Sequence, residues 1–320
     1  MYKALVTGAA GFIGGHLTQA LLKEGWTVFG VDDLSSGMQS TLDMHIERGN
    51  FSPVYLDIAD PNSFFRLEAV FRDFSPDYVF HLAAIPGVVQ SVHDPVRSNY
   101  ANVTGTLNLL ELSRRYASKR FIFSSSSSVY GDNARVPTKE CSPLSPKSPY
   151  ALQKKMGEEY CSLFSDTYNL ETVSLRYFNV FGPRQRADSA YAAVISAFCD
   201  CLSSGREPII YGDGEQSRDF CYIDNVVAAN ILAATSVEKF SGEVFNIGCG
   251  GRTTVIELCT LLGTKDPIFS EAREGDVSHS QADISKARGV LGYEPKTSLE
   301  QGLSMTRDWY LEQRSVNSQE

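Results

Sequence analysis

A glycine-rich turn near the N-terminus constrains the fold more than any other feature of this sequence. Gly8, Gly11 and Gly14 lie in TGAAGFIGGH, between the β-branched run Tyr2–Thr7 and the helical pattern Phe12–Lys23. Glycines at such a turn let a pyrophosphate approach the backbone, and the start of the helix offers free N–H groups and a positive dipole. A tight strand-to-helix turn without a ligand would also need glycine, so the triplet alone is weak evidence.

The first half of the chain alternates short β-branched runs with helical periodicity. This alternation predicts an α/β fold with a Rossmann-type, doubly wound parallel sheet. Loops lengthen after about residue 180, and we interpret the remainder as a smaller C-terminal α/β domain. We expect residues 1–178 with about 224–248 to form the first domain, and residues 179–223 with 249–320 to form the second. The expected strands are Tyr2–Thr7, Thr27–Asp32, Val54–Leu56, Tyr78–His81, Arg120–Ser124 and Glu171–Tyr177, and the expected helices include Phe12–Lys23, Val96–Tyr116 and Pro149–Tyr168.

Residues at the ends of the next strands favour a dinucleotide in the glycine turn. Asp32 ends the second expected strand, eighteen residues after Gly14. A carboxylate there accepts hydrogen bonds from an adenosine ribose and repels a 2′-phosphate, so it favours NAD over NADP. Asp57 and Ile58, after the third strand, are expected to border the adenine. The fourth strand ends in residues that would let the dinucleotide lie close, namely Leu82, Ala83 and Ala84.

A tyrosine and a lysine share one face of the helix that Ser148 is expected to cap. Tyr150 and Lys154 are four residues apart, and residues at this spacing are neighbours on a helix. A tyrosine with a pKa of about 10 needs something that stabilises its phenolate before it can act as a base near neutrality. A neighbouring ammonium and a cationic nicotinamide would both do so. The pair also arises by chance, but its place after the fifth strand of this pattern favours catalysis.

The serine run Ser124–Ser128 closes the fifth expected strand. Ligands bind at the carboxyl ends of strands in open α/β sheets. A flexible linker is the alternative interpretation, but the run is held between the apolar segments FIF and VYG. We therefore expect it to form the hydroxyl-lined floor of a site.

Charge and cysteine content narrow the class of protein. The net charge of −9 disfavours nucleic acid and anionic membrane surfaces as partners. Seven scattered cysteines form no CxxC and no zinc-type spacing with histidine, so we expect no metal and a reduced, cytoplasmic protein. The N-terminus lacks the regions of a signal peptide, and no apolar run is long enough to span a bilayer.

Eight motifs, in order along nearly the whole chain, resemble those of the extended short-chain dehydrogenase/reductase superfamily, and within it the UDP-hexose 4-epimerases. They are TGAAGFIGGH, HLAA, NVTGTLNLLE, SSSSSVYG, SPYALQKK, RYFNVFGPRQ, GDGEQSRDFCYIDN and REGDVSHSQADISKA. The resemblance implies redox-neutral epimerisation at C4 of a UDP-hexose with tightly bound NAD. It also implies a UDP-sugar-binding second domain and a homodimer formed through helices near 97–116 and 150–168.

The resemblance also implies roles for single residues. Tyr150 would be the base, Lys154 would tune it and hold the nicotinamide ribose, and Ser126 would bond the substrate 4-hydroxyl. Asn179 and two arginines would hold the diphosphate, which suits the bidentate geometry of guanidinium groups. The cofactor contacts would be completed by Phe12, Ile13 and Asn102. The full set of expected substrate contacts is Ser126, Ser127, Ser128, Asn179, Val194 at the uracil, Arg218, Arg273, Asp276 at the ribose, and Ser280.

Four positions separate the related activities of the families that this chain resembles. Sugar-nucleotide dehydratases resembling this chain carry two acids where it has Ser127 and Ser128, and water elimination needs an acid and a base there. UDP-glucuronate 4-epimerases generally have threonine at the position of Asn179, so that activity is the alternative. By the same resemblance, Ser280 stands where the bulk of the side chain controls access for an N-acetyl group. A small residue there favours UDP-GlcNAc and UDP-GalNAc, with UDP-Glc and UDP-Gal as further substrates. A plain packing role for Ser280 is the alternative. A net oxidoreductase and a non-catalytic NAD- or sugar-nucleotide-binding protein are the other interpretations.

Overall fold

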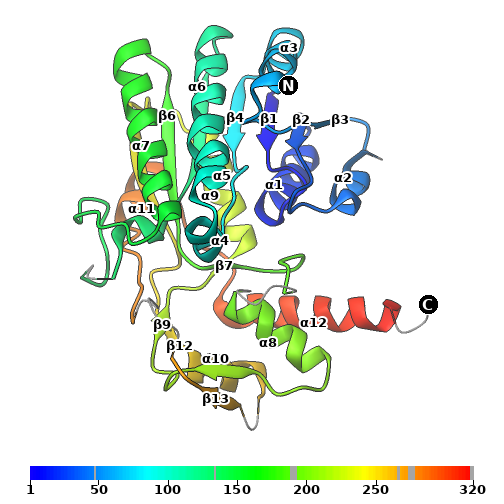
Figure 1. Cartoon of the computed structure of the whole chain (residues 1–320), viewed down its shortest axis with the longest axis vertical. Helices are drawn as coiled ribbons and strands as arrows, with labels where there is room; N and C mark the ends of the chain where they lie inside the picture. Colours follow the sequence, from blue (N-terminus) through cyan, green and yellow to red (C-terminus); the bar gives the residue numbers. More distant parts are fainter. Residues whose placement is uncertain (47, 133–134, 188–192, 265–266, 273–277, 318–320) are drawn as a thin grey trace.

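The computed structural model describes residues 1–46, 48–132, 135–187, 193–264, 267–272 and 278–317 of the chain. Figure 1 shows a sheet of parallel strands flanked by helices, with a group of shorter elements beyond one end of the strands. The sheet has seven strands in the order β11-β6-β5-β4-β1-β2-β3, and every pair in it is parallel. The predicted Rossmann-type α/β fold is confirmed. The strands are β1 (Lys3–Thr7), β2 (Thr27–Asp32), β3 (Phe51–Tyr55), β4 (Tyr78–His81), β5 (Arg120–Ser126), β6 (Thr172–Tyr177) and β11 (Glu243–Ile247).

Two hydrophobic cores lie on the two faces of this sheet, because successive side chains of a strand point to opposite faces. Leu5 belongs to the core that includes residues of α3, α6 and α7. Its neighbours Ala4 and Val6 belong to the core that includes residues of α1 and α9. The helices concerned are α1 (Phe12–Lys23), α3 (Phe64–Phe74), α6 (Gly105–Arg115), α7 (Pro149–Tyr168) and α9 (Ile223–Thr235).

The helix expected over Val96–Tyr116 is divided. The structure has α5 (Pro95–Asn99), a π-helical turn η2 (Tyr100–Thr104) and then α6. The turn places Asn102 in the interior, where its side chain bonds both backbone groups of Ile85. Apolar periodicity cannot predict such a local change of winding, which often occurs near functional sites. The other helical elements that precede α5 in the chain are α2 (Gln39–Ile46), η1 (Pro61–Ser63) and α4 (Val88–His93).

Two strand predictions need correction at their ends. β3 covers Phe51–Tyr55 rather than Val54–Leu56, and it includes Pro53. Proline is tolerated there because β3 is the last strand of the sheet. β5 extends to Ser126, since the serines pair with β6 up to Tyr177, and the run then turns into the 3₁₀ helix η3 (Ser127–Tyr130).

The second half of the chain builds beyond the carboxyl ends of the strands (Figure 1) and then returns to the sheet through α9 and β11. Its described residues form three two-stranded pairs rather than a second large sheet. The proposed boundaries of the two domains remain a prediction. The elements of this half are β7 (Val180–Phe181), α8 (Val194–Ser203), β8 (Ile209–Tyr211), β9 (Ser217–Arg218), β10 (Cys221–Tyr222), β12 (Thr253–Thr254), α10 (Val255–Leu262), β13 (Ile268–Ser270), α11 (Ser285–Leu291) and α12 (Leu299–Asn317).

Candidate active site

A cavity of about 1020 Å³ opens at the carboxyl ends of β1, β2 and β4. The order of the strands reverses at β1, which lies between β2 and β4, and open α/β sheets bind ligands at such a switch point. All of the residues predicted for cofactor contact in the glycine turn and at the strand ends line this cavity, whereas the predicted contacts Asn102, Tyr150 and Lys154 do not. The predicted residues that line it are Gly8, Gly11, Phe12, Ile13, Gly14, Asp32, Asp57, Ile58, Leu82, Ala83 and Ala84.

The glycine turn is a cradle that side chains would fill. Gly8 has a positive φ of 72°, and a Cβ built there would lie 2.8 Å from the backbone nitrogen of Ala83. A Cβ on Gly14 would lie 2.0 Å from the carbonyl oxygen of Gly8. No side chain caps the start of α1 at Gly11, so the first N–H groups of the helix lack a local acceptor. The residues present therefore fit the pyrophosphate of a dinucleotide.

Asp32 is held at the edge of this cavity by two backbone donors. Ala10 N–H donates to one oxygen at 2.9 Å, and Leu34 N–H donates to the other at 2.8 Å. Burial raises the pKa of Asp32 above its ordinary value, and these two bonds oppose the shift. Asn102 does not line the cavity; it bonds Ile85 and the side-chain oxygen of Gln153 at 2.8 Å. Its observed role is to fix the loop after β4, and its cofactor contact remains a prediction.

The predicted catalytic pair lies on the first turns of α7. Ser148 accepts a hydrogen bond from Ala151 N–H at 3.1 Å and Pro149 follows it, so the predicted cap is confirmed. The Nζ atom of Lys154 donates to the carbonyl oxygen of Ser124 at 2.7 Å and lies 5.8 Å from the ring centroid of Tyr150. Tyr150 is also hydrogen-bonded to Ser126. The structure thus brings Ser126, Tyr150 and Lys154 together.

Burial dominates the electrostatics of the pair. It raises the pKa of Tyr150 to about 12, against the opposing hydrogen bond with Ser126. It lowers the pKa of Lys154 to about 8, and the charge of Glu158 opposes that shift. In the protein alone, the stabilisation of the phenolate expected from Lys154 does not outweigh burial. A basic Tyr150 near neutrality therefore needs a further positive charge in the cavity.

A buried ion pair stands one helical turn beyond Lys154. Arg176 on β6 forms two hydrogen bonds with the Glu158 carboxylate, at 2.8 and 2.6 Å. Ser125 donates to the same carboxylate at 2.5 Å, and Arg176 also donates to the hydroxyl of Tyr130 at 2.7 Å. The pair therefore joins α7 to the ends of β5 and β6, which carry the serine floor. Sequence analysis missed it because only the pairing of β5 with β6 brings these residues together.

Ser127 and Ser128, the last two serines of the run, lie in the 3₁₀ helix η3. Ser127 begins η3, and the backbone N–H of Ser128 donates to Ser126 Oγ at 3.2 Å. The hydroxyl oxygen of Ser128 is buried and has no hydrogen-bond partner among the described residues. Neither side chain is an acid or a base, so the two serines offer no proton transfer for water elimination.

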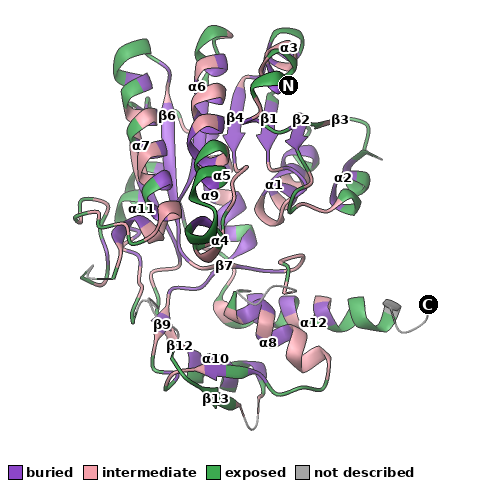
Figure 2. Ribbon diagram, in the orientation of Figure 1, coloured by how far each residue is buried: buried purple, intermediate pink, exposed green. Residues whose placement is uncertain are grey.

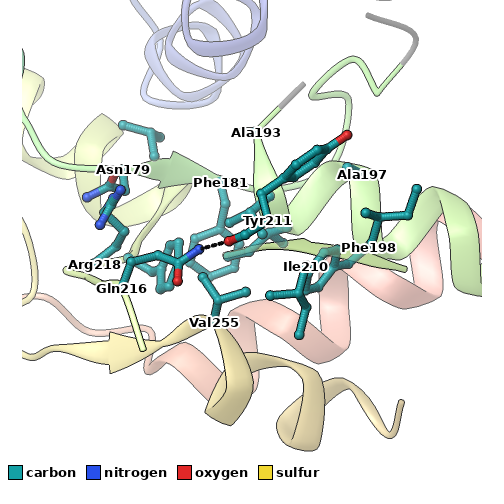
Figure 3. A pocket seen from close by; sticks show the side chains of 15 residues that line it. Asn179, Phe181, Ala193, Ala197, Phe198, Ile210, Tyr211, Gln216, Arg218 and Val255 are labelled. Carbon is teal, nitrogen blue, oxygen red and sulfur yellow. Dashed lines mark hydrogen bonds between the residues drawn. The ribbon is translucent and has the colours of Figure 1, made fainter. Parts of the chain in front are cut away.

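A second pocket of about 270 Å³ adjoins the first, and Val180 lines both. Asn179, Val194 and Arg218, three predicted substrate contacts, line it. Figure 3 shows Asn179 and Arg218 at one end of the pocket, with Gln216 beside them. The Nη1 atom of Arg218 donates to the carbonyl oxygens of Ser217 and Ser278. The remaining lining is largely apolar, with Phe181, Ile195, Phe198, Ile210, Phe220 and Val255.

Six predicted substrate residues are not placed at this pocket by the structure. Ser126, Ser127 and Ser128 line neither cavity and lie at the end of β5 and in η3. Arg273 and Asp276 lie outside the described residues. Ser280 lines neither of the two cavities described above. Its backbone N–H donates to the carbonyl oxygen of Ser217 at 2.9 Å, so it lies beside β9.

Arg184 is a cavity residue that sequence analysis missed. It lines the large cavity, and its Nη2 atom donates to Gln19 on α1 at 2.9 Å. Its Nη1 atom is buried and has no partner among the described residues. A cation beside the start of α1 suits a pyrophosphate. The sequence motif GPRQ could have indicated this role, because it carries Arg184 just after β7.

Membrane-spanning helices and clusters of metal ligands are both absent from the described residues. Within these residues no helix is long and apolar enough to cross a bilayer. The same residues contain no group of three or more histidine, cysteine or acidic side chains that could hold a metal ion.

Comparisons with known proteins agree with this geometry. The profile of the NAD dependent epimerase/dehydratase family matches residues 4–248. A UDP-glucose 4-epimerase of Mycolicibacterium smegmatis is 38% identical over 314 residues, covering 96% of this chain and 98% of the relative. The structure of UDP-N-acetylglucosamine 4-epimerase from Methanobrevibacter ruminantium M1 with UDP-N-acetylmuramic acid has a TM-score of 0.90 at 40% identity, covering 98% of this chain and 99% of that one. UDP-glucuronic acid 4-epimerase from Bacillus cereus, with UDP-glucuronic acid and NAD, has a TM-score of 0.87 at 34% identity, covering 97% and 99%.

Proposed function

Because this chain belongs to the NAD-dependent epimerase/dehydratase family, we propose that it is a UDP-sugar 4-epimerase whose preferred substrates are UDP-GlcNAc and UDP-GalNAc. UDP-Glc and UDP-Gal are proposed as further substrates. One observation carries the assignment: Lys154 of the Ser126–Tyr150–Lys154 cluster is bonded to Ser124 in the wall of the dinucleotide cavity, and the pocket of Asn179 and Arg218 shares Val180 with that cavity. Hydride chemistry and a nucleotide anchor are therefore combined in one site.

The residues of the cluster divide the work at the substrate 4-hydroxyl. Bound NAD supplies a hydride acceptor and donor at C4. The Tyr150 phenolate accepts the proton of the hydroxyl and later returns it. Since the hydride would also return to C4, no net oxidation occurs. Ser126, which already bonds Tyr150, orients the hydroxyl. The Lys154 ammonium, fixed on Ser124, holds a positive charge beside the phenolate.

The second pocket is suited to anchor the nucleotide while the sugar turns. Epimerisation requires the hydride to return to the opposite face of C4, so the sugar must be held loosely and the nucleotide firmly. Arg218 and Asn179 at the polar end would bind the diphosphate. Val194 and its apolar neighbours would contact the base. Arg273 and Asp276 are proposed to complete this binding of diphosphate and ribose.

UDP-glucuronate is the second candidate substrate. A UDP-glucuronic acid 4-epimerase is among the similar structures, so the fold admits that activity. Asn179, in place of the threonine expected by resemblance, disfavours it. Elimination of water is disfavoured more strongly, because Ser127 and Ser128 replace the acid and base that it needs.

The deciding experiment incubates the purified protein with UDP-GlcNAc, UDP-GalNAc, UDP-Glc, UDP-Gal and UDP-glucuronate, and resolves the C4 epimers by chromatography. We expect interconversion of the N-acetylated pair at the highest kcat/KM, with nicotinamide retained and no change in absorbance during turnover. Net production of NADH would assign the protein to the oxidoreductases instead. Absence of turnover on every sugar, with NAD bound, would favour a non-catalytic binding protein.

Ser280 is proposed as the residue that admits the N-acetyl group. The Ser280→Tyr variant should lose turnover of UDP-GalNAc while it keeps turnover of UDP-galactose, because the larger side chain excludes only the acetamido group. Ser280→Ala is the matched control, since it removes the hydroxyl without adding bulk. A wild-type protein that turns over UDP-galactose as fast as UDP-GalNAc would refute the preference.

We also propose that the protein is a homodimer. Val88, Val92, Val96 and Tyr100 are each 46–65% exposed on α4, α5 and η2, and α4 and α5 pack against α7. Leu152 on α7 adds 47% exposure, and Figure 2 shows exposed residues on these helices. A clustered apolar surface of this kind is typical of an interface. Sedimentation at micromolar concentration should show a species of twice the chain mass.

A further inference from the structure

A buried carboxylate lies beside the second pocket and is not used by the proposed mechanism. Asp219 lies between β9 and β10, directly after Arg218, and the residue is 1% exposed. It lines neither of the two cavities described above. A buried charge is costly unless hydrogen bonds satisfy it. The partners of this carboxylate therefore indicate what it does for the residues around it.

The Asp219 carboxylate joins separate segments of the chain. Its Oδ1 atom accepts a hydrogen bond from the backbone N–H of Cys249 at 2.8 Å. Its Oδ2 atom accepts two more, from the N–H groups of Gly250 and Ala282, at 2.9 and 3.0 Å. The first two donors lie in the turn after β11, and the third lies in residues 278–283. One buried group thus holds the connection of β9 to β10, this turn and the later segment together.

Both residues predicted to bind the diphosphate depend on the parts that Asp219 joins. The Nη1 atom of Arg218 donates to the carbonyl oxygen of Ser278 at 3.3 Å. The side-chain amide of Asn179 donates to the backbone carbonyl oxygen of Asp219 at 3.2 Å. Arg218 and Asn179 lie together at one end of the pocket (Figure 3). A shift of the carboxylate would therefore reach both of them through hydrogen bonds and one peptide unit.

Ser280 lies in the same segment as the third donor. Its backbone N–H donates to the carbonyl oxygen of Ser217 at 2.9 Å, and the Ser217 N–H donates to the carbonyl oxygen of Ser278 at 3.0 Å. The side chain of Gln281 donates to a carbonyl oxygen of the turn after β11 at 2.9 Å. The segment is thus bonded both to β9 and to this turn, and the carboxylate of Asp219 adds a buried bond to each contact.

We propose that Asp219 is a positioning residue for the nucleotide anchor. Its carboxylate fixes Arg218 and Asn179, which would bind the diphosphate, and it does not itself touch the substrate. This inference rests on the proposed function, in which those two residues hold a UDP-sugar. An anchor binds the substrate and the transition state alike, so its loss raises KM and leaves kcat unchanged. The residues that line the dinucleotide cavity keep their places, so NAD should be retained.

Gly248 offers a way to displace the carboxylate without removing it. A Cβ built on Gly248 would lie 2.7 Å from Oδ2 of Asp219 and 2.9 Å from the Cβ atom of Ala282. A displaced Oδ2 would lose the geometry of its hydrogen bonds with Gly250 and Ala282. Gly251, in the same turn, has nothing within 4 Å of its Cβ position. Gly248→Ala and Gly251→Ala are therefore a matched pair.

The test compares the wild type with Asp219→Asn, Gly248→Ala and Gly251→Ala. Asparagine keeps the shape of the side chain, but its amide replaces one acceptor oxygen by a donor that would face a backbone N–H. Calorimetry measures the Kd of UDP, and turnover of the UDP-sugar that the wild type converts fastest gives KM and kcat. We expect Kd and KM to rise about tenfold in the first two variants, as for one buried hydrogen bond. Bound NAD and kcat should stay unchanged, and Gly251→Ala should match the wild type.

Three results would overturn the inference. An unchanged Kd of UDP in Asp219→Asn and Gly248→Ala, with normal turnover, would remove the role of Asp219 and leave the proposed function standing. Losses of kcat and bound NAD that parallel the rise in Kd would show a general structural role instead. A wild type that holds NAD but binds no UDP would refute the proposed function and this inference together. If Asp219→Asn does not fold, Gly248→Ala against Gly251→Ala decides the question.

Discussion

At the scale of single residues, the hydroxyl of Tyr150 is the atom on which the proposed chemistry depends. Tyr150→Phe removes the only proton acceptor that the described cluster offers to the 4-hydroxyl, while the ring keeps its packing. We expect kcat to fall by roughly 10²- to 10⁴-fold, which is the usual contribution of general acid–base catalysis. NAD released from the denatured variant should match the wild-type amount. Retained activity in a variant that binds NAD normally would contradict the assignment of Tyr150.

Lys154 should make the free energy of unfolding rise as the pH increases from about 8 to 10.5. Its pKa in the folded protein is about 8, below the ordinary 10.5, so the unfolded chain binds more protons between these values. Stability attributable to this group therefore rises with pH across that window. Lys154→Met removes the rise, and the free energy of unfolding of the wild type relative to the variant should increase by up to roughly 3 kcal/mol from pH 8 to 10.5. Denaturant unfolding at several pH values measures it; a constant difference would refute the shift.

At the scale of secondary-structure elements, the joint between β1 and α1 depends on Gly14. In Gly14→Ala the new methyl group meets the carbonyl oxygen of Gly8 at 2.0 Å, and backbone must move. We expect a loss of about 1–3 kcal/mol of stability together with loss of bound NAD. Gly289→Ala in α11 is the matched control, because nothing lies within 4 Å of its Cβ position. It should be neutral or stabilise by about 0.5–1 kcal/mol; equal behaviour of the two variants would contradict the cradle.

The ion pair between α7 and β6 should show strong coupling. Glu158→Leu or Arg176→Met alone leaves one buried charge without its partner, which costs about 3–5 kcal/mol. The double replacement Glu158→Leu with Arg176→Met should cost much less, and a double-mutant cycle measures the difference. Glu159→Gln is the control on the same helix, since its pair with Lys155 is exposed and contributes at most about 0.5 kcal/mol. Additive losses from the two single changes would refute the coupling.

Some helices and strands of this protein could be predicted from the sequence, and others could not. β2, β4, α1 and α7 were predicted with the bounds observed, because each depends on local periodicity and caps. The division of the helix at Tyr100–Thr104 was not predictable from local pattern. It depends on the hydrogen bonds between the buried Asn102 side chain and the backbone of Ile85, seventeen residues earlier. The Glu158–Arg176 pair and the cavity position of Arg184 depend on strand pairing and on contacts across the chain. The local sequence pattern thus predicts the glycine turn and the helix that carries Tyr150 and Lys154. It does not predict the buried ion pair and the cavity arginine beside them.

At the scale of the whole molecule, the proposed dimer makes the apolar surface of α4, α5 and η2 testable. Replacing Val88 and Val92 with Asp together should convert the dimer to a monomer, because each buried carboxylate would lack a partner. Both residues lie on α4 and line neither cavity. Val237→Asp is the control, since Val237 is 96% exposed and lies outside this surface. Light scattering after size exclusion gives the mass. A variant that remains dimeric would place the interface elsewhere.

The position of β11 has a consequence for synthesis on the ribosome. β6 is an open sheet edge until β11 pairs with it, and β11 ends only at Ile247. Vectorial synthesis therefore delivers six strands of the sheet, with one unpaired apolar edge, long before the seventh strand emerges. Exposed edges invite pairing with other chains. Truncations that stop before Glu243 should aggregate, whereas nascent chains that extend past Ile247 can cover the edge of β6 with β11.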